Sequence, residues 1–394
     1  MVILNSINQM QEEMKEWRQD LHKIPEIGLE EYETSAYIKD KLKLWNIQFK
    51  EGYSNTGIIA WVEGSKSNND NNKSIGLRAD FDALPMPEKN EFKHKSTKEG
   101  MMHACGHDGH TTMLLGAAKY LSENDNFDGT VHFIFQPGEE GFAGGKKMIE
   151  DGMFKDFNIQ EVYALHNWPE LPLGTIALNS GPMMAAVDEF DITVQGKGGH
   201  AAMPQLAIDP IVIASQIVIA VQTIISRSIN PVDKALISIT KIHGGTAYNV
   251  IDDEVKLSGT IRTFKPETRS FIEKKMKEVA EGIAKAQGAG VNIEFDLVNK
   301  YPATINSKKE SEFAASVAKK VVGEENVITD IDPCMGGEDF SYLLNEKPGS
   351  YLYIGQGDNN HSAHLHTTKY DFNDNLLPLG VNFWVDLVKN YFEK

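Results

Sequence analysis

The sequence predicts an α/β fold with a mostly parallel central sheet, interrupted by a smaller inserted α+β domain. Three observations lead to this prediction. The first 186 residues alternate between apolar strands and amphipathic helices, a pattern typical of parallel sheets that are covered on both faces. Residues 187–300 follow the order β-α-β-β-α-β, the ferredoxin-like split pattern. From Tyr301 onward the α/β character returns.

The length of 394 residues also favours two domains, because single hydrophobic cores stop growing beyond about 250 to 300 residues. We therefore expect a discontinuous larger domain, made of residues 1–186 and 301–394. The smaller domain, residues 187–300, is expected to be inserted into it.

Charge and cysteine content limit the classes of partner and compartment. The chain has 39 basic and 56 acidic side chains, a formal charge of −17, which argues against nucleic acid and anionic membranes as partners. Two cysteines far apart in sequence fit a reducing compartment. The first residues lack a basic segment followed by a long apolar stretch, so we expect no secretory signal and a cytoplasmic protein. The apolar run 210–225 is short for a membrane span and contains Gln216 and Gln222, which favours a buried helix.

The larger domain begins with two expected helices and then strands. Hydrophobic periodicity predicts helices over 7–22 and 31–44, and strands over 57–62, 75–77, 130–135 and 161–165. The polar segment 65–74 between two of these strands is expected to be a solvated loop. Near the C-terminus we expect helices over 310–322 and 375–392 and a strand over 350–354.

The inserted domain is expected to open with a strand that begins at residue 187. A helix over 209–227, strands over 235–242 and 255–263, a helix over 267–287 and a strand over 291–297 follow it.

Polar side chains follow successive predicted strands at the points where they end. Asp80 and Asp82 follow one strand, Glu139 and Glu140 follow the next, and His166 follows a third. Ligand sites in open α/β sheets lie at the carboxyl ends of the strands. Each acidic pair alone is equally compatible with solvated loop charges, but their repeated placement indicates a shared site.

The run M-M-H-A-C-G-H-D-G-H-T-T-M-L-L-G, residues 101–116, lies between two of these strands. Cys105 and His107 can ligate a metal ion from one loop, because thiolates and neutral imidazoles are ligands that zinc and related metals prefer. Taken alone, the run also fits an ordinary buried cysteine with capping or surface histidines. The metal interpretation therefore depends on the neighbouring clusters.

A hydrolytic metal site needs ligands, an open position for water and a base. Adjacent side chains in an extended segment point in opposite directions, so one of Glu139 and Glu140 can bind metal while the other faces the substrate. His361, His364 and His366 offer a further ligand near the C-terminus. The number of candidate ligands exceeds the needs of one ion, which makes two ions plausible.

The sequence resembles a family of metal-dependent amidohydrolases. That family includes hippurate hydrolase, N-acyl-amino-acid amidohydrolases, auxin-conjugate hydrolases and N-acetyl-diaminopimelate deacetylase, within the aminoacylase and carboxypeptidase superfamily. The resemblance runs in order from about His22 to Asp374. It rests on R-A-D-F-D-A-L-P, M-H-A-C-G-H-D-G-H, Q-P-G-E-E-G-F-A-G-G, H-N-W-P, G-G-H-A-A-M-P, A-Y-N-V-I, G-T-I-R-T-F, M-G-G-E-D-F and L-H-T-T-K-Y-D-F-N-D.

The resemblance implies a role for each matching residue in the larger domain. Glu139 would be the general base, and Asp82 would orient a ligating histidine. His110 would be structural, and His103 and Asp108 would support the site. His364 competes with His366, but the family pattern places the ligand just before T-T-K-Y-D-F, where many relatives have a proline and this chain has Thr368. The metal ligands would be Cys105, His107, Glu140, His166 and His366.

The inserted domain would supply further groups. His200 would reach the active site of a second subunit and stabilise the oxyanion. Asn249 and Arg262 would hold the substrate carboxylate, since a guanidinium binds a carboxylate through two hydrogen bonds. In the larger domain, Gly336 and Gly337 would let the backbone approach the substrate, and Cys334 is expected to serve packing. The inserted domain would thus act as a lid and as the contact of a homodimer or higher homo-oligomer.

The resemblance therefore implies a metallopeptidase-like enzyme that hydrolyses the amide of N-acyl amino acids with divalent metal, two ions of zinc, manganese, cobalt or nickel per subunit. The nearest alternative is a dipeptidase or carboxypeptidase on the same scaffold. A thiol enzyme with Cys105 as nucleophile and a non-catalytic binding protein are alternatives from other classes. The acyl group, the amino acid and the metal are not determined by these patterns.

Overall fold

The computed structural model describes residues 3–67, 73–296 and 300–393. The described chain divides into two compact units. The first comprises Met1–Met183, Thr304–Pro333 and Asp339–Lys394, and the second comprises Met184–Ala303 and Cys334–Glu338. The predicted insertion, residues 187–300, lies within the second unit, which also takes in the short segment 334–338.

The first unit is built on an eight-stranded sheet with the order β1-β2-β4-β3-β5-β16-β6-β15. Its strands are β1 (Gln48–Tyr53), β2 (Gly57–Glu63), β3 (Ser74–Asp80), β4 (Thr130–Gln136), β5 (Glu161–Pro172), β6 (Ile176–Ala177), β15 (Val327–Ile328) and β16 (Gly349–Gly357). A separate short pair joins β7 (Pro182–Met184) and β14 (Thr304–Ile305). The four central strands, β4, β3, β5 and β16, are parallel, which confirms the predicted fold class.

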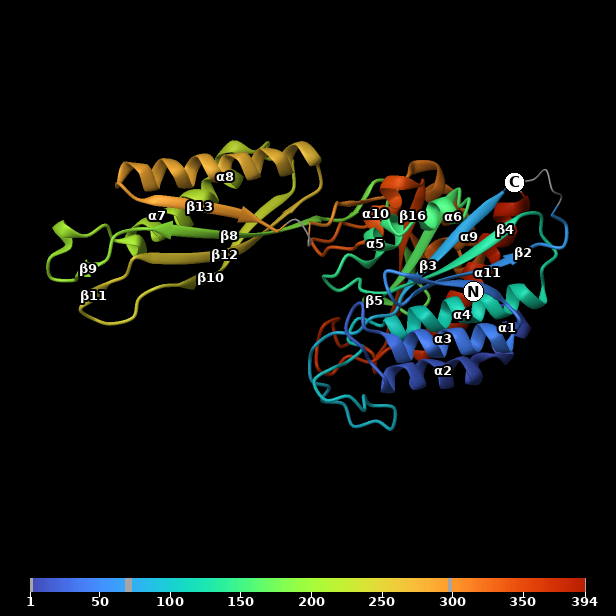
Figure 1. Ribbon diagram of the computed structural model, residues 1–394. Coiled ribbons are helices and arrows are strands. Elements are labelled where there is room, and N and C mark those ends of the chain that lie inside the picture. The colour runs from blue at the N-terminus through green and yellow to red at the C-terminus, as the bar shows by residue number, and fades with distance from the viewer. Residues whose placement is uncertain (1–2, 68–72, 297–299, 394) are drawn as a thin grey trace. The chain divides into compact units, whose positions relative to one another are not determined.

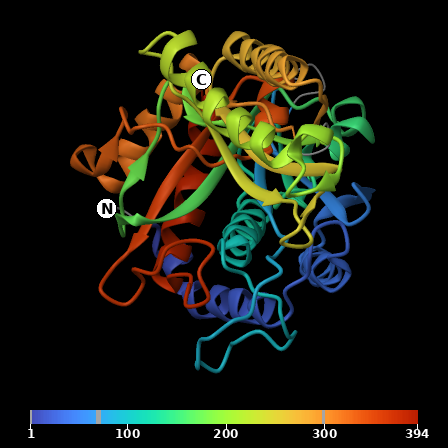
Figure 2. The same cartoon turned by 90° about the vertical axis from the view of Figure 1, so that its left-hand side faces the viewer.

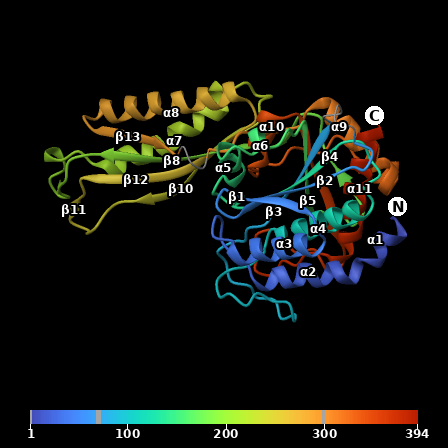
Figure 3. The same ribbon diagram turned by 45° about the vertical axis from the view of Figure 1, so that its right-hand side comes forward.

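Helices cover both faces of this sheet. They are α1 (Asn5–Gln9), α2 (Gln11–Lys23), α3 (Tyr32–Leu44), α4 (His107–Glu123), α5 (Gly144–Glu150), α6 (Met153–Asp156), α9 (Lys308–Val322), α10 (Phe340–Glu346) and α11 (Leu377–Glu393). α4 packs against the sheet, with α2, α3 and α11 against it (Figure 3). α5 and α10 pack on the opposite face (Figure 1). Two 3₁₀ turns, Glu324–Asn326 and Asp374–Leu376, precede β15 and α11.

The central strands are in a register that aligns their carboxyl ends. Asp80 of β3 is paired with Gln136 of β4, and Arg78 is paired with Ala164 of β5. Every residue of β3 is buried, as expected for a strand with neighbours on both sides and helices on both faces. The polar groups that follow these strands therefore begin at one edge of the sheet.

The second unit has a four-stranded antiparallel sheet with the order β10-β12-β8-β13. Its elements are β8 (Ala186–Gln195), β9 (Gly199–His200), a 3₁₀ turn at Pro204–Leu206, α7 (Pro210–Thr223), a π-helical turn at Ile224–Ser228, β10 (Ala235–His243), β11 (Val250–Ile251), β12 (Glu254–Thr263), α8 (Pro266–Ala286) and β13 (Gly290–Phe295). α7 and α8 lie side by side on one face of the sheet (Figure 2). The element order and strand order are those of the ferredoxin-like pattern.

Helix α7 and the turn that follows it combine a buried face with an exposed apolar face. Ile213, Ile217 and Val221 are buried against the sheet, whereas Ile219 is 71% exposed. Among the described residues, Pro210–Ser228 is one helix that is long and apolar enough to cross a membrane by length and composition, with 28% of its window buried. The expectation of a buried helix thus holds for one face.

Most predicted elements are present with small shifts at their ends, and two differ. The helix expected over 7–22 is two helices, α1 and α2, separated at Met10. The strand expected to end at residue 165 continues as β5 to Pro172, because it stays paired with β16 beyond the end of β3. Several short elements, including β1 and α10, were not predicted. Residues 68–72 of the expected loop and residue 297 of the last expected strand lie outside the described residues.

Candidate metal centre

The loop before α4 brings a thiol and an imidazole to the edge of the sheet. The helix begins at His107, and the preceding Gly106 has a φ of +91°. A Cβ at Gly106 would lie 2.3 Å from Oδ1 of Asn167 and 2.6 Å from the hydroxyl of Tyr370. Glycine is therefore required at this position both by the backbone conformation and by the lack of space.

Three soft or imidazole donors converge at this edge. The Sγ atom of Cys105 lies 3.4 Å from Nε2 of His166. One ligand atom from each of Cys105, His107 and His166 lies within 4.8 Å of the others, and all three residues are buried. This spacing suits donors that share one ion.

Carboxylates from the next strand end complete a second, overlapping set. Glu140 lies in one such group with Cys105 and His366, and in another with His107 and Glu139. Nε2 of His366 is 3.1 Å from Oε1 of Glu140. His366 has a φ of +58°, an uncommon conformation for a residue with a side chain. The structure thus brings together the five predicted ligands and the predicted base, in overlapping sets that suit two ions.

His107 shows that these residues fit a metal ion. Its Nδ1 donates to the carbonyl oxygen of Asp82 at 2.9 Å and lies 3.2 Å from the Oδ1 atom of the same residue. Its Nε2 is buried and has no hydrogen-bond partner within the described parts of the chain. A carboxylate that holds one ring nitrogen and leaves the other as a free donor atom is the usual arrangement around a metal-ligating histidine.

The electrostatics of the cluster favour a cation. Burial opposes a charge on His107, but Asp80 and Asp82 outweigh it and raise the pKa of His107 to about 10. Burial lowers the pKa of His166 well below its usual range, and the neighbouring His110 and His107 add to this effect. His166 is therefore a neutral imidazole, the form that ligates.

The thiol of Cys105 is not activated by the protein itself. Burial, together with the carboxylates of Glu140 and Glu139, raises the pKa of Cys105 well above its usual range. A catalytic cysteine needs the opposite shift. This shift of the pKa argues against the thiol-enzyme alternative and suits a thiol whose proton is displaced when a cation binds.

A buried hydrogen-bond network, which was not predicted from the sequence, lies next to the cluster and supports it. Arg78 donates to Asp80 at 2.7 Å, to Asp339 at 2.9 Å and to Gln136 at 2.9 Å. Asp80 in turn holds Nδ1 of His110 at 2.5 Å. Arginine in the otherwise apolar strand S-I-G-L-R-A-D is the signal that could have indicated this network.

His110 has partners at both ring nitrogens. Besides Asp80, its Nε2 lies 2.6 Å from Oδ1 of Asn167. Asp80 also forms a group of potential metal ligands with His107 and His110. With both nitrogens engaged, His110 serves to connect α4 with β3 and β5.

A second buried ionic group lies on the other side of α4. His22 lies 2.7 Å from Asp108 through Nδ1 and 3.2 Å from Glu88 through Nε2. Arg18 is 3.6 Å from Asp108 and makes two hydrogen bonds with Asp374, at 2.6 and 2.9 Å. This group ties α2 to the first turn of α4, next to His107.

The remaining candidate ligands lie elsewhere in the first unit. His364 is largely exposed and lies 2.5 Å from Glu170. His361 lies 2.8 Å from Asp358. Both ring nitrogens of His103 are buried without a hydrogen-bond partner in the described segments. Of the three histidines near the C-terminus, His366 is the one placed beside Glu140.

The other predicted site residues belong to the second unit. His200 pairs with Val250 through β9 and β11, and the N–H of Ala201 donates to the carbonyl of Asn249. His200 and Asn249 are therefore close neighbours.

Arg262 lies on β12, and its Nε donates to the carbonyl of Met335 at 3.2 Å. It lines a groove of about 540 Å³ on the sheet, together with the carboxylates of Glu189, Asp191, Glu294 and Asp296. A Cβ at Gly337 would lie 2.2 Å from Cγ2 of Val187, so this position admits only glycine without rearrangement. Met335 and Gly337 belong to the short segment 334–338, which thus packs within the second unit.

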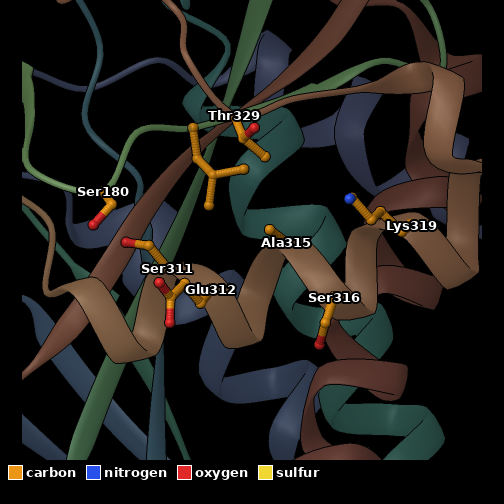
Figure 4. A pocket seen from close by; sticks show the side chains of 8 residues that line it. Ser180, Ser311, Glu312, Ala315, Ser316, Lys319 and Thr329 are labelled. Carbon is orange, nitrogen blue, oxygen red and sulfur yellow. The ribbon is translucent and has the colours of Figure 1, made fainter.

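A groove of about 290 Å³ in the first unit runs along α9. Ser311, Glu312, Ser316 and Lys319 project from this helix, with Ser180 and Thr329 from neighbouring segments (Figure 4). None of the predicted site residues lines it.

Thiolate, imidazole and carboxylate donors at the carboxyl edge of a parallel sheet, with a further buried carboxylate beside them, define a metal-dependent hydrolase. The chain belongs to peptidase family M20/M25/M40, whose model matches residues 76–390.

Characterised relatives are similar over most of their length. The chain is 38% identical to hippurate hydrolase of Campylobacter jejuni, covering 100% of both chains. It is 41% identical to N-acetyl-L-cysteine deacetylase of Bacillus subtilis, over 88% of this chain and 81% of the relative. A Bacillus subtilis structure described as a dinuclear metal binding peptidase from the M20 family superposes with a TM-score of 0.84. It is 32% identical, covering 98% of this chain and 99% of that one. The resemblance recognised in the sequence is thus confirmed.

Proposed function

We propose that this protein hydrolyses the amide bond of N-acyl amino acids, with Glu139 as the general base. The relatives support this substrate class, because those named above are a hydrolase of hippurate and a deacetylase of N-acetyl-L-cysteine. A dipeptidase or carboxypeptidase activity on the same scaffold is the alternative, since those substrates also present an amide and a carboxylate.

The position of Glu139 is the observation that carries the proposal. Its side chain is 7% exposed, and one of its oxygens lies within 4.8 Å of a ligand atom of His107 and of Glu140. The N–H of Asp339 donates to Oε1 of Glu139 at 3.4 Å. Glu139 is thus held beside the proposed ligands without being needed as one of them, as a general base must be.

Cys105, His107, Glu140, His166 and His366 would hold the ions, and Asp82 would fix the ring of His107. Divalent metals at such a site polarise an amide carbonyl and make water a nucleophile at neutral pH. Glu139 would take the proton of the attacking water and pass it to the leaving nitrogen.

The donor set does not select one metal. A thiolate with imidazoles and carboxylates admits zinc, manganese, cobalt and nickel. Two overlapping sets of donors support two ions per subunit, and the dinuclear relative is consistent with this.

We propose that the second unit supplies His200 for the oxyanion and Asn249, Arg262 and Gly337 for the substrate, within a homodimer. The exposed apolar face of α7 supports self-association: Ile211, Val212 and Ile219 are 46%, 47% and 71% exposed. Large apolar side chains exposed on one helix are a feature of interaction sites. The formal charge of −17 and two free cysteines fit the proposed cytoplasmic location.

The decisive experiment is a substrate panel of N-acetyl amino acids, N-benzoyl amino acids and dipeptides, assayed on protein loaded with each metal. We expect hydrolysis of N-acyl amino acids, lost on chelation and restored by metal. Preference for dipeptides would favour the alternative, and absence of turnover on the whole panel would favour a binding protein.

Glu139→Gln tests the base directly. Removing the base should lower kcat by about 10²- to 10⁴-fold, the usual contribution of general base catalysis, while metal content stays unchanged. Glu150→Gln, an exposed glutamate on α5, is the matched control. Near-normal turnover by Glu139→Gln would show that another group is the base.

A further inference from the structure

The segment before α3 lies directly against the loop that carries Glu139. A Cβ at Gly28 would lie 2.9 Å from Cα of Gly138 and 2.4 Å from the ring of Phe142. On its other side the segment contacts the strand end with Asp82, because the N–H of Ala83 donates to the carbonyl of Glu26 at 2.8 Å. The segment therefore connects two of the loops that build the candidate metal centre.

Glu31 is the polar contact between this segment and the Glu139 loop. Its side chain is fully buried. Oε1 accepts hydrogen bonds from the N–H groups of Leu29 and Gly138, both at 2.9 Å. Oε2 accepts from the hydroxyl of Thr56 at 2.6 Å. Both oxygens are thus engaged, one of them by the residue that immediately precedes Glu139.

Asp82 makes the matching contact on the other side of Glu139. Its Oδ2 accepts from the N–H of Glu140 at 2.9 Å. The N–H groups of the residues before and after Glu139 are therefore each held by a buried carboxylate. Because Gly138 has a φ of +61° and Gly141 a φ of +88°, the loop has a conformation that its local sequence alone would not hold rigidly.

The burial of Glu31 is energetically costly for the fold. Its three hydrogen-bond donors are neutral groups. Burial and the nearby Asp82 raise its pKa to about 7. An isolated buried carboxyl group with neutral partners contributes little net stability, so its value to the protein lies in the loop that it holds.

We propose that Glu31 is a positioning residue that, together with Asp82, fixes the orientation of Glu139. The inference rests on the proposed role of Glu139 as the base. Glu31 itself contacts no proposed metal ligand; it acts through the N–H of Gly138.

The test compares Glu31→Ala, Glu31→Gln and the exposed neighbour control Glu30→Gln. Glutamine keeps an oxygen for the two N–H groups and turns its amide toward Thr56, so it should retain most of the wild-type kcat. Alanine leaves the loop unanchored, and kcat should fall by about 100-fold, the effect of displacing a catalytic group by about 1 Å. KM and metal content should stay near their wild-type values, because the ligands are untouched.

Hydrogen exchange of the amides in residues 137–141 gives a readout independent of activity. The amide of Gly138 should exchange faster in Glu31→Ala and remain protected in Glu31→Gln and Glu30→Gln. Faster exchange together with the loss of kcat supports the proposal. Unchanged exchange and unchanged kcat in Glu31→Ala would overturn it, as would a Glu31→Gln variant that is as impaired as alanine in both.

Two further outcomes remain decisive. If Glu31→Ala does not fold, Glu31→Met keeps the volume of the side chain but cannot accept the N–H of Gly138. Wild-type exchange at Gly138 with wild-type kcat in that variant would refute the anchor. If Glu139→Gln retains activity, the proposed base is wrong. The exchange result then still shows whether Glu31 holds the loop.

Discussion

His22→Gln is expected to reduce the free energy of unfolding at neutral pH but to have a much smaller effect above pH 9. His22 is buried, with one ring nitrogen facing Asp108 and the other facing Glu88. Burial opposes a charge on the ring, but the charge of Asp108 and the hydrogen bonds to both carboxylates outweigh it. They raise the pKa of His22 from 6.5 to about 9.

The sign and size of the expected change in the free energy of unfolding follow from this pKa shift. A pKa that is higher in the folded state stabilises the fold fully below the unfolded value of 6.5, and the stabilisation is lost as the pH rises through 9. The difference corresponds to about 3 kcal/mol at low pH, about 1.4 kcal/mol at pH 8 and almost nothing at pH 10. Glutamine cannot be protonated, so the variant lacks this pH-dependent part.

The assay is urea denaturation of wild type and variant at pH 6.5, 8 and 10, with the metal content held constant. His364→Gln is the control, because His364 is 72% exposed and its pair with Glu170 lies at the surface, where such pairs contribute about 0 to 1 kcal/mol. A difference between wild type and His22→Gln that stays constant from pH 6.5 to pH 10 would refute the reasoning.

Two further predictions concern the residues around the metal centre. Arg78→Met leaves Asp80 and Asp339 buried without their guanidinium partner, so unfolding should become easier by about 3 to 5 kcal/mol; thermal unfolding measures this. Lys39→Met, which breaks the ion pair with Glu51 at the surface, is the control. An effect of Arg78→Met as small as that of Lys39→Met would contradict the prediction. Addition of metal at pH 7 should release a proton from Cys105, whose pKa burial holds well above its usual range. Calorimetry in buffers of different ionisation enthalpy detects this proton. Cys105→Ala should release fewer protons than wild type, whereas the control Cys334→Ala should release as many. Equal release by Cys105→Ala and wild type would exclude the thiol as the source.

The parts of the fold with strong periodicity were predictable from sequence. Strands such as β4 and helices such as α8 carry their own hydrophobic pattern, so their positions differed from expectation by only a few residues. The same reasoning located the candidate site, because the carboxyl ends of parallel strands meet at one edge. The sequence alone therefore predicts that Cys105, Glu140 and His166 lie near one another.

Contacts between distant segments were not predictable in this way. Arg78 and Asp339 are 261 residues apart, and no local pattern indicates that they meet. The segment 334–338 belongs to the second unit although its neighbours on both sides belong to the first. The anchoring of Gly138 by Glu31 likewise depends on a turn whose φ values the sequence does not specify.

The pairing of β5 with β16 has a consequence for how the chain acquires its metal. Val162 is aligned with Gly349, so this part of the sheet closes only after a very long loop has been formed, which is intrinsically slow. Cys105 and His107 come from one loop and are available much earlier than His366. During refolding or synthesis, an ion that arrives early therefore meets only part of the donor set. Cysteine and histidine side chains bind metals in unfolded chains as well. Whether the sheet closes before or after metal is supplied would then determine what fraction of the protein binds metal with the complete set of ligands.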